Sequence, residues 1–339
     1  MNADPAHAIA TATATARPVV IAGSNRRNPG TPLRPEMFEG HPANRSAAER
    51  RAISLTARRT VKKEWQAAWL VNAIRCMDLT TLAGDDTAER VARLCAKARQ
   101  PLAPRIVEGL AIAALKLTTG AVCVFPTMVP HAVKALAGSG IPVASVATGF
   151  PTGLMPLRLR LEEIRYAVGE GAEEIDIVIT REHVLNGNWK ALYGEVCAMR
   201  EACGTAHLKA ILATGELQTL RNVYSAAMVA MQAGADFIKT STGKEGVNAT
   251  LPVSLVMLRA LRDYLDATGH RVGFKPAGGM RTAKDALNWQ FLMKEEMGRD
   301  WLKPELFRLG ASSMLADIER QLEHFVTGRY ASFSRHAMA

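Results

Sequence analysis

From about residue 74 onward the chain alternates between short apolar runs and amphipathic stretches, and this alternation constrains its fold more than any other feature. Short apolar runs rich in β-branched residues are typical of buried strands, and the stretches between them have helical spacing. We expect strands at 74–79, 121–125, 141–147, 175–179, 207–212, 235–239, 271–275 and 306–309. We expect helices near 87–99, 104–116, 130–138, 158–170, 190–203, 217–233, 252–267, 282–297 and 312–326.

Eight strand–helix units within about 250 residues predict an α/β protein with a closed (β/α)8 TIM barrel. An open doubly wound sheet is the alternative. It is disfavoured because the first unit lacks the G-x-G-x-x-G pattern of dinucleotide-binding sheets. The Gly243-Lys244 pair is followed by Glu245 and has Ile238 where a phosphate loop needs its first glycine. Neither common mode of nucleotide binding is therefore expected.

Composition divides the chain into four segments. Residues 1–45 contain a TATATA repeat and a stretch rich in Pro, Asn, Gly and Arg, which predicts a disordered basic extension. Residues 46–73 have near-helical apolar spacing and predict one leading helix. The barrel is expected over 74–330, and residues 331–339 are expected to form a C-terminal tail.

Charge and cysteine usage limit the partners and the compartment. The net charge is +10, of which residues 1–63 carry +7, so positive and negative charges nearly balance in the rest of the chain. A solvated N-terminal tail is favoured over one that binds nucleic acid. Five scattered cysteines without a C-x-x-C pattern indicate free thiols and predict a cytoplasmic protein. No apolar run is long enough to span a membrane, and no histidine spacing indicates a metal site.

A barrel places its chemistry at the carboxyl ends of its strands. Lys239 ends the sixth expected strand, Lys275 ends the seventh, and Asp176 lies in the fourth. A lone lysine at a strand end usually reaches water, but two lysines on neighbouring strands repel each other in a dry interior and indicate a site. The Gly278-Gly279 and Ser312-Ser313 turns precede helices, where backbone N–H groups bind anions, although both also suit ordinary turns and caps.

Two close lysines are the arrangement that imine formation requires. A free lysine is neutral in only roughly one molecule in 2,500 at pH 7. Burial and a neighbouring cation both disfavour the charged form, and a pKa of about 7–8 raises the reactive fraction by about two to three orders of magnitude. We therefore predict that one lysine is a nucleophile, that the second lowers its pKa, and that Asp176 moves protons.

Several motifs resemble those of the deoxyribose-phosphate aldolase family, in order over about residues 60–330. The resemblance implies a class I aldolase that uses a lysine Schiff base and needs no metal or other cofactor. It implies reversible cleavage of a phosphorylated sugar, 2-deoxy-D-ribose 5-phosphate, to acetaldehyde and D-glyceraldehyde 3-phosphate in deoxyribose phosphate catabolism, and commonly a homodimer. The motifs are FIKTSTGK (237–244), GFKPAGGMRTAKDA (273–286), MDLTTL (77–82), EIDIVI (174–179), LATGEL (212–217) and RLGASSML (308–315), with ARRTVKKEWQAAWL (57–70) similar to the longer animal branch.

The resemblance also implies roles for individual residues. Lys239 forms the Schiff base, Lys275 perturbs it and relays protons, and Asp176 donates and accepts protons through an ordered water. Cys123 is placed near the aldehyde, although ordinary core packing explains it equally well. The remaining substrate-binding residues are Gly243, Lys244, Gly278, Gly279, Ser312 and Ser313 for the phosphate, Asp78 and Thr80 for the sugar side, and Lys209 as a supporting charge near Asp176.

Two other interpretations stay open at this point. One is a barrel enzyme that uses Lys239 on another phosphorylated aldehyde or keto sugar. The other is a barrel without catalysis that binds partners through its basic tail; it is disfavoured because a retired site has no reason to retain two repelling lysines. Shorter members of the family that this chain resembles can end in a tyrosine that reaches the active site, whereas nine residues follow Tyr330 here, so the roles of Tyr330 and of the tail are left open.

Overall fold

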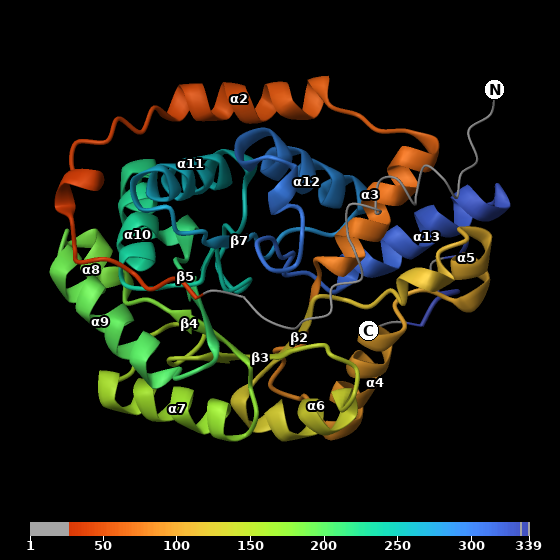
Figure 1. Ribbon diagram of the computed structural model, residues 1–339, viewed down its shortest axis with the longest axis horizontal. Helices are drawn as coiled ribbons and strands as arrows, with labels where there is room; N and C mark the ends of the chain where they lie inside the picture. Colours follow the sequence, from red (N-terminus) through yellow and green to blue (C-terminus); the bar gives the residue numbers. More distant parts are fainter. Residues whose placement is uncertain (1–26, 333, 338–339) are drawn as a thin grey trace.

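Seven parallel strands, each paired with the next along the chain, form the centre of the computed structural model, which describes residues 27–332 and 334–337 (Figure 1). Such a succession is expected when every strand is followed by a helix that returns the chain to the same end of the sheet. The strands are β1 (Asp78–Thr80), β2 (Ala121–Val124), β3 (Val143–Ala147), β4 (Glu174–Val178), β5 (His207–Ile211), β6 (Phe237–Lys239) and β7 (Gly273–Lys275).

An eighth segment, residues 306–310, closes the ring between β7 and β1. Phe307 forms a parallel bridge with Phe274 of β7, and Leu309 forms one with Met77 just before β1. The predicted TIM barrel is therefore confirmed, although its last strand consists of isolated bridges and not of a continuous ladder.

Alternation along each strand separates an apolar outer layer from a polar interior. On β4, Ile175 and Ile177 belong to the main hydrophobic core between the strands and the helices. Glu174 and Asp176 point the other way and bond to lysine and arginine side chains across the barrel. Because successive side chains of a strand face opposite sides, the same short segments build both the core and the site.

Helices surround the strands and bury apolar stripes against them (Figure 1). In the last helix, Leu315, Ile318 and Leu322 are buried at helical spacing, and Gly328 ends the helix with a φ of 70°. The helices are α2 (Arg45–Arg58), α3 (Lys63–Arg75), α4 (Ala88–Arg99), α5 (Pro104–Gly109), α6 (Val129–Leu136), α7 (Leu157–Gly169), α8 (Arg181–Leu185), α9 (Trp189–Ala202), α10 (Leu220–Gln232), α11 (Leu251–Thr268), α12 (Ala283–Met297) and α13 (Ser313–Thr327).

Some element bounds differ from the predicted ones. The run at 74–79 begins in the last turn of α3 and becomes a strand only at Asp78. The helix expected over 104–116 stops at Gly109, and Ala111 shortly after it has a left-handed φ of 55°, which a continuing helix does not allow. The single helix expected over 46–73 is two helices, and α8 was not predicted.

The segment before the barrel packs against it from residue 27 onward, whereas residues 1–26 of the predicted disordered extension lie outside the described residues. Asn28 is only 4 % exposed, and its side-chain amide donates to the carbonyls of Met231 and Ala235 at 2.7 and 2.9 Å. Met231 lies in the last turn of α10 and Ala235 lies just after the helix, where carbonyl groups have no helical hydrogen-bond partner. Residues 27–45 are therefore not a solvated tail, because Asn28 satisfies buried backbone groups that composition does not reveal.

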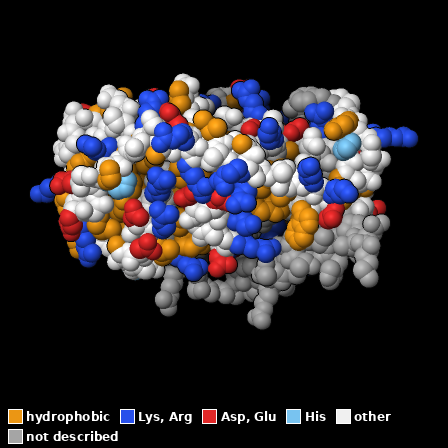
Figure 2. Space-filling view, turned by 90° about the horizontal axis from the view of Figure 1, so that it is seen from above, with side chains coloured by type: hydrophobic (Ala, Val, Ile, Leu, Met, Phe, Trp, Pro, Cys, Tyr) orange, Lys and Arg blue, Asp and Glu red, His pale blue; other side chains and the backbone are white. Residues whose placement is uncertain are grey.

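The basic residues of α2 and its flanks have a structural use. Arg51 pairs with Glu295 and Glu296 of α12 at 3.0 and 3.2 Å, and Arg59 also pairs with Glu295. These contacts hold α2 across α12, and Figure 2 shows lysine and arginine side chains gathered on this face of the molecule. Part of the N-terminal charge therefore anchors a helix to the barrel.

The C-terminal segment docks at the far end of α13. Tyr330 is 69 % exposed and its ring stacks on His324 with centroids 4.0 Å apart, in the last turn of the helix. The first turn of α13 follows the carboxyl end of the eighth segment, so Tyr330 is roughly a helix length of 22 Å away from that end of the barrel. Among the described residues, no helix combines the length and the apolar character needed to cross a bilayer.

Candidate active site

Asp176 stands at the centre of a cluster of charged side chains inside the barrel. Its Oδ2 accepts hydrogen bonds from Lys239 Nζ at 2.7 Å and from Lys275 Nζ at 2.8 Å, and its Oδ1 accepts one from Lys209 Nζ at 2.8 Å. Lys239 and Lys275 share one carboxylate oxygen, so their nitrogens are close neighbours. The structure thus brings the two predicted strand-end lysines together on the predicted acid.

Further ion pairs surround this carboxylate. Lys275 Nζ is 2.6 Å from Asp78 Oδ2, and Lys209 Nζ is 2.6 Å from Glu174 Oε2. Arg308 joins the two outer carboxylates, because its guanidinium donates to Asp78 Oδ1 and to Glu174 Oε1, each at 2.7 Å. Asp78 and Lys209, predicted to bind substrate, therefore lie within the ion cluster and are fully buried.

The cluster carries more positive than negative groups. None of its members is more than 5 % exposed. An unpaired charge is costly in such a place, and a buried lysine can remove it by losing a proton. The cluster consists of four cationic side chains and three carboxylates, namely Lys209, Lys239, Lys275, Arg308, Asp78, Glu174 and Asp176.

The two neighbouring lysines have pKa values shifted in opposite directions. Burial lowers the pKa of Lys239; Asp176 opposes and Lys275 reinforces this, and the net pKa lies below its usual value. Burial also acts to lower the pKa of Lys275, but Asp176 and Asp78 outweigh it and raise the pKa above normal. Of the two, Lys239 is therefore the amine that loses its proton more readily, and Lys275 is the one held as an ammonium group.

Asp176 stays ionised in this setting. Burial acts to raise its pKa, but the three surrounding lysines, Lys209, Lys239 and Lys275, hold that pKa well below its usual value. A carboxylate that contacts both an amine and an ammonium group can accept a proton from one and donate it to the other. The arrangement can thus perform nucleophilic attack together with proton transfer.

Strand register explains why these side chains meet. Asp176 on β4 pairs directly with Lys209 on β5, and Lys239 on β6 pairs directly with Lys275 on β7. Glu174 precedes Asp176 by two residues and so faces the same side of β4. All five groups therefore point into the barrel because of local strand geometry.

The opposite wall of the interior is apolar. Cys123 of β2 packs with Ala144 and Val146 of β3, against the partly buried rings of Phe125 and Phe150. Burial raises the pKa of the Cys123 thiol to about 11, so the thiol stays protonated near neutral pH. The packing interpretation of Cys123 thus agrees with its surroundings, and this wall presents an apolar surface to the barrel interior.

The loops predicted to bind phosphate gather above the ion cluster. A Cβ on Gly243, after β6, would lie 3.9 Å from the Cα of Gly278, after β7, so these two turns adjoin. Lys244 and Gly279 are exposed beside them. Several backbone N–H groups are thus brought to the carboxyl ends of adjacent strands, where anions are commonly held.

Ser312 ties the start of α13 to β1. Its hydroxyl accepts from the amide of Thr80 and donates to the carbonyl of Thr80, each at 2.8 Å. This hydroxyl consequently makes no cap for α13, whose first amides have no side-chain cap, and Ser313 is exposed at the same end. The predicted residues Thr80, Ser312 and Ser313 therefore lie together at an uncapped helix N-terminus.

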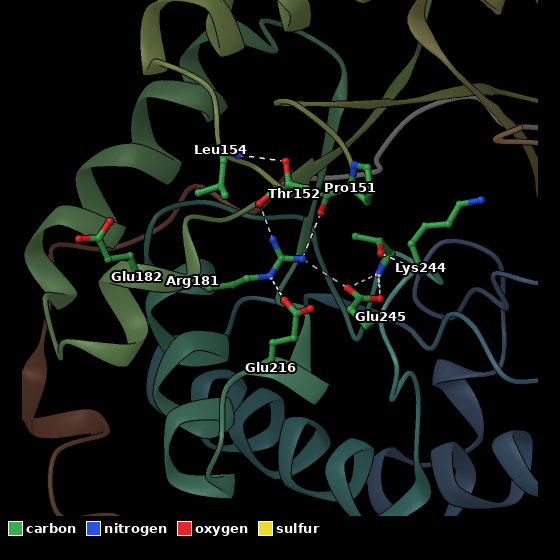
Figure 3. Close-up of a pocket in the computed structure, with 9 residues that line it drawn as sticks. Pro151, Thr152, Leu154, Arg181, Glu182, Glu216, Lys244 and Glu245 are labelled. Carbon is green, nitrogen blue, oxygen red and sulfur yellow. Dashed lines mark hydrogen bonds and ion pairs between the residues drawn. The ribbon is translucent and has the colours of Figure 1, made fainter. Parts of the chain in front are cut away.

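A cavity of about 330 Å³ opens beside these loops, and Arg181 lies at its centre (Figure 3). The guanidinium donates to the carbonyls of Thr152 and Pro151 at 2.5 and 3.1 Å and pairs with Glu216 at 2.6 Å. It also lies 3.6 Å from Glu245. Arg181 thereby connects the loops that follow β3, β4, β5 and β6.

Glu245 occupies backbone donors of the predicted phosphate loop. Its carboxylate accepts from the amide of Thr242 at 3.0 Å and from the amide of Gly243 at 3.2 Å. Figure 3 shows Lys244 pointing away from Arg181, while Glu245 points toward it. An internal carboxylate thus lies where an anionic ligand of this loop would bind.

Sequence reasoning missed Glu174, Arg308, Arg181 and Glu245. Glu174 could have been found, because a residue two positions before Asp176 on a strand shares its face. Arg308 lies in a predicted strand, but its partners are 134 and 230 residues away in the chain. Arg181 opens an unpredicted helix. No local pattern marks the partners of Arg308 or Arg181.

The fold is that of a (β/α)8-barrel enzyme, and the site holds two adjacent lysines and an aspartate at the carboxyl ends of the strands. A family model described as DeoC/LacD family aldolase matches residues 72–298, and the chain belongs to this family.

Relatives agree with this assignment and with the resemblance to the animal branch. Deoxyribose-phosphate aldolase of Bos taurus is 62 % identical over 292 residues, 86 % of this chain and 92 % of that protein. The Homo sapiens enzyme of the same name is 60 % identical over 308 residues, 90 % of this chain and 97 % of that protein. A solved structure of deoxyribose phosphate aldolase from Aeropyrum pernix shares the fold, with a TM-score of 0.56 and 21 % identity over 83 % of this chain and 99 % of that one.

Proposed function

We propose that this protein is a deoxyribose-phosphate aldolase, which reversibly cleaves 2-deoxy-D-ribose 5-phosphate to acetaldehyde and D-glyceraldehyde 3-phosphate. The observation that carries the proposal is the single Asp176 oxygen shared by Lys239 and Lys275, whose pKa values are shifted in opposite directions. Membership of the DeoC/LacD aldolase family and identities of 60–62 % to enzymes of this name support the choice of substrate.

Lys239 supplies the nucleophile in this proposal. Its neutral amine attacks C1 of the open-chain sugar, and loss of water from the carbinolamine gives an iminium ion. The iminium draws the electron pair of the C2–C3 bond as the C3 hydroxyl loses its proton, so that bond breaks and D-glyceraldehyde 3-phosphate leaves. Protonation of C2 of the remaining enamine, followed by hydrolysis, releases acetaldehyde and restores the amine.

Asp176 and Lys275 divide the proton transfers. The Lys275 ammonium donates a proton when the carbinolamine hydroxyl leaves as water, and the Asp176 carboxylate accepts protons from the substrate and returns them to the enamine. Both groups contact the same small volume as the Lys239 nitrogen. Their pKa directions support these starting states, since Asp176 stays ionised and Lys275 stays protonated.

The phosphate is proposed to bind at the rim, above the ion cluster. Backbone N–H groups of the Gly243 and Gly278-Gly279 turns, the uncapped start of α13 at Ser312-Ser313, and the Lys244 ammonium are the donors. Thr80 lies beside Ser312 and faces the sugar side. Asp78 and Lys209 are proposed to act through the ion cluster, since both are fully buried.

The compartment and assembly follow as lesser parts of the proposal. All five cysteines are free and four of them are buried, which supports a reducing compartment such as the cytoplasm. The barrel over residues 74–330 is proposed as the catalytic unit, with the preceding helices as structural supports. The homodimer stays a prediction.

Trapping with acetaldehyde and borohydride tests the proposal. Reduction of the imine should leave an ethyl group on Lys239, located by peptide mass spectrometry, and Lys239→Met should abolish it. Lys97→Met provides a matched control, because Lys97 is buried on α4 and pairs with Glu319 outside the barrel interior. Absence of an adduct with acetaldehyde, or an adduct on a different lysine, would contradict the proposal, and trapping only with another phosphorylated sugar would favour the alternative substrate.

A further inference from the structure

The ion cluster is electrically balanced only when Lys239 is neutral. Lys209, Lys275 and Arg308 provide three positive charges for the three carboxylates, and Lys239 adds a fourth. A buried cluster with one surplus charge is less stable than a balanced one. The count of the other charges therefore decides which protonation state of Lys239 the barrel favours.

Arg308 is the permanent cation in this count. A guanidinium does not release its proton in proteins, whereas a buried lysine can. Arg308 contacts Asp78 and Glu174, and its guanidinium lies 5.9 Å from the centre of the Phe237 ring. The Phe237 ring has room because residue 273 is glycine: a Cβ there would lie 2.3 Å from the ring.

Without Arg308, the balance would reverse. Asp78 and Glu174 would lose their shared partner, and three carboxylates would face only three lysines. Lys239 would then be needed as an ammonium group to neutralise the cluster. Arg308 thus neutralises the carboxylates of Asp78 and Glu174, which would otherwise stabilise the protonated form of Lys239.

Within residues 27–332 and 334–337, the other groups that face this interior do not change the count. Cys123 on β2 has a protonated thiol, and the sequence of β3 contains no charged residue. The charged groups come from β1, β4, β5, β6, β7 and the eighth segment, and they are Asp78, Glu174, Asp176, Lys209, Lys239, Lys275 and Arg308.

We propose that Arg308 is a positioning residue for the aldol reaction, which keeps Lys239 in its neutral, nucleophilic form by neutralising Asp78 and Glu174 inside the barrel. This inference rests on the proposed role of Lys239 as the Schiff-base nucleophile. It assigns to Arg308 an electrostatic effect on Lys239 that is transmitted through two carboxylates.

Opposite charge changes at the same ion pair test the inference. Arg308→Met should move the acid limb of the pH profile for borohydride trapping to higher pH by about one unit, since a unit charge acting across roughly 10 Å at an effective dielectric constant of about 20 shifts a pKa by about that much. Trapping at pH 7 should slow by about tenfold. Glu174→Gln removes a negative charge and should move the same limb to lower pH.

Two further variants separate charge from structure. Arg308→Lys keeps the positive charge but loses the planar guanidinium that bonds to both carboxylates, so its pH profile should stay near that of the unaltered protein. The double variant Arg308→Met/Glu174→Gln restores the original charge balance and should return the limb toward its original position. Circular dichroism checks that each variant is folded; if Arg308→Met is not, the downward shift in Glu174→Gln decides the question.

The outcomes distinguish this inference from the proposed function. If the unaltered protein fails to form the Lys239 adduct with acetaldehyde, the proposed function is wrong. If it forms the adduct but the folded Arg308→Met and Glu174→Gln variants keep its pH profile, or both shift it in one direction, the role of Arg308 is overturned and the proposed function stands.

Discussion

Replacing Lys275 by methionine removes the ammonium group beside Lys239 while keeping a side chain of similar length. Two unit charges about 4 Å apart interact by about 4 kcal/mol at an effective dielectric constant of about 20. One pKa unit corresponds to about 1.36 kcal/mol, so the pKa of Lys239 should rise by about two to three units. Asp176 and Asp78 reinforce the rise, because both pair with Lys275 and would be left with fewer cations.

The expected result is a loss of reactive amine. At pH 7 the neutral fraction of Lys239 should fall by about a hundredfold to a thousandfold, and kcat/KM should fall at least as much, because Lys275 is also the proposed proton donor. The sign of the pH effect follows from the raised pKa of Lys239: trapping should recover as pH increases toward about 10. KM should change little.

The assay is the rate of borohydride trapping with acetaldehyde across this pH range, together with steady-state release of D-glyceraldehyde 3-phosphate. Lys244→Met is the matched control, because Lys244 is an exposed lysine at the rim. This substitution should raise KM for the phosphorylated sugar and leave the acid limb of the trapping profile at the same pH. An acid limb that stays at the same pH in Lys275→Met would refute the reasoning that Lys275 helps to keep Lys239 neutral.

Three other changes have defined expectations. Glu245→Gln should lower KM for 2-deoxy-D-ribose 5-phosphate by about threefold to tenfold, because it removes a carboxylate that competes for loop amides; KM for unphosphorylated deoxyribose should not change, and a parallel fall would count against it. Asn28→Ala should destabilise the protein by about 2–3 kcal/mol through buried carbonyls left unpaired, measured by urea unfolding, with the exposed cap variant Asn44→Ala costing about 1 kcal/mol or less. Equal losses would contradict this difference. Asp176, Asp78 and Glu174 all have lowered pKa values, so the stability they contribute is complete above their ordinary pKa near 4 and is lost as pH falls below it; a melting temperature that does not fall in acid would contradict this sign.

The candidate site could be predicted from sequence where it depends on single strands. Lys239 and Lys275 end expected strands, and Asp176 lies inside one, so the barrel rule places all three at one end of the ring. Arg308 escaped this reasoning because its importance depends on carboxylates of two distant strands. A residue whose role is electrostatic is identified only when all of its neighbours are known.

The same contrast explains the errors in the fold. Expected strands and helices hold because periods of 2 and 3.6 residues record which face of each element is buried. The packed segment from residue 27 was taken for a solvated tail, since asparagine is common in loops and Asn28 is buried through partners on α10, on α11 and just before β6. Polar burial of this kind leaves no periodic trace.

By itself, the sequence determined the eight-unit barrel, the family motifs and the positions of the lysines and Asp176, because each depends on a local pattern. The family resemblance implied the roles of the two lysines, but only the tertiary structure decided which contacts lower the pKa of Lys239 and raise that of Lys275. Burial acts on both lysines alike, so the difference arises because Lys275 also pairs with Asp78 of β1, a residue far away in the chain.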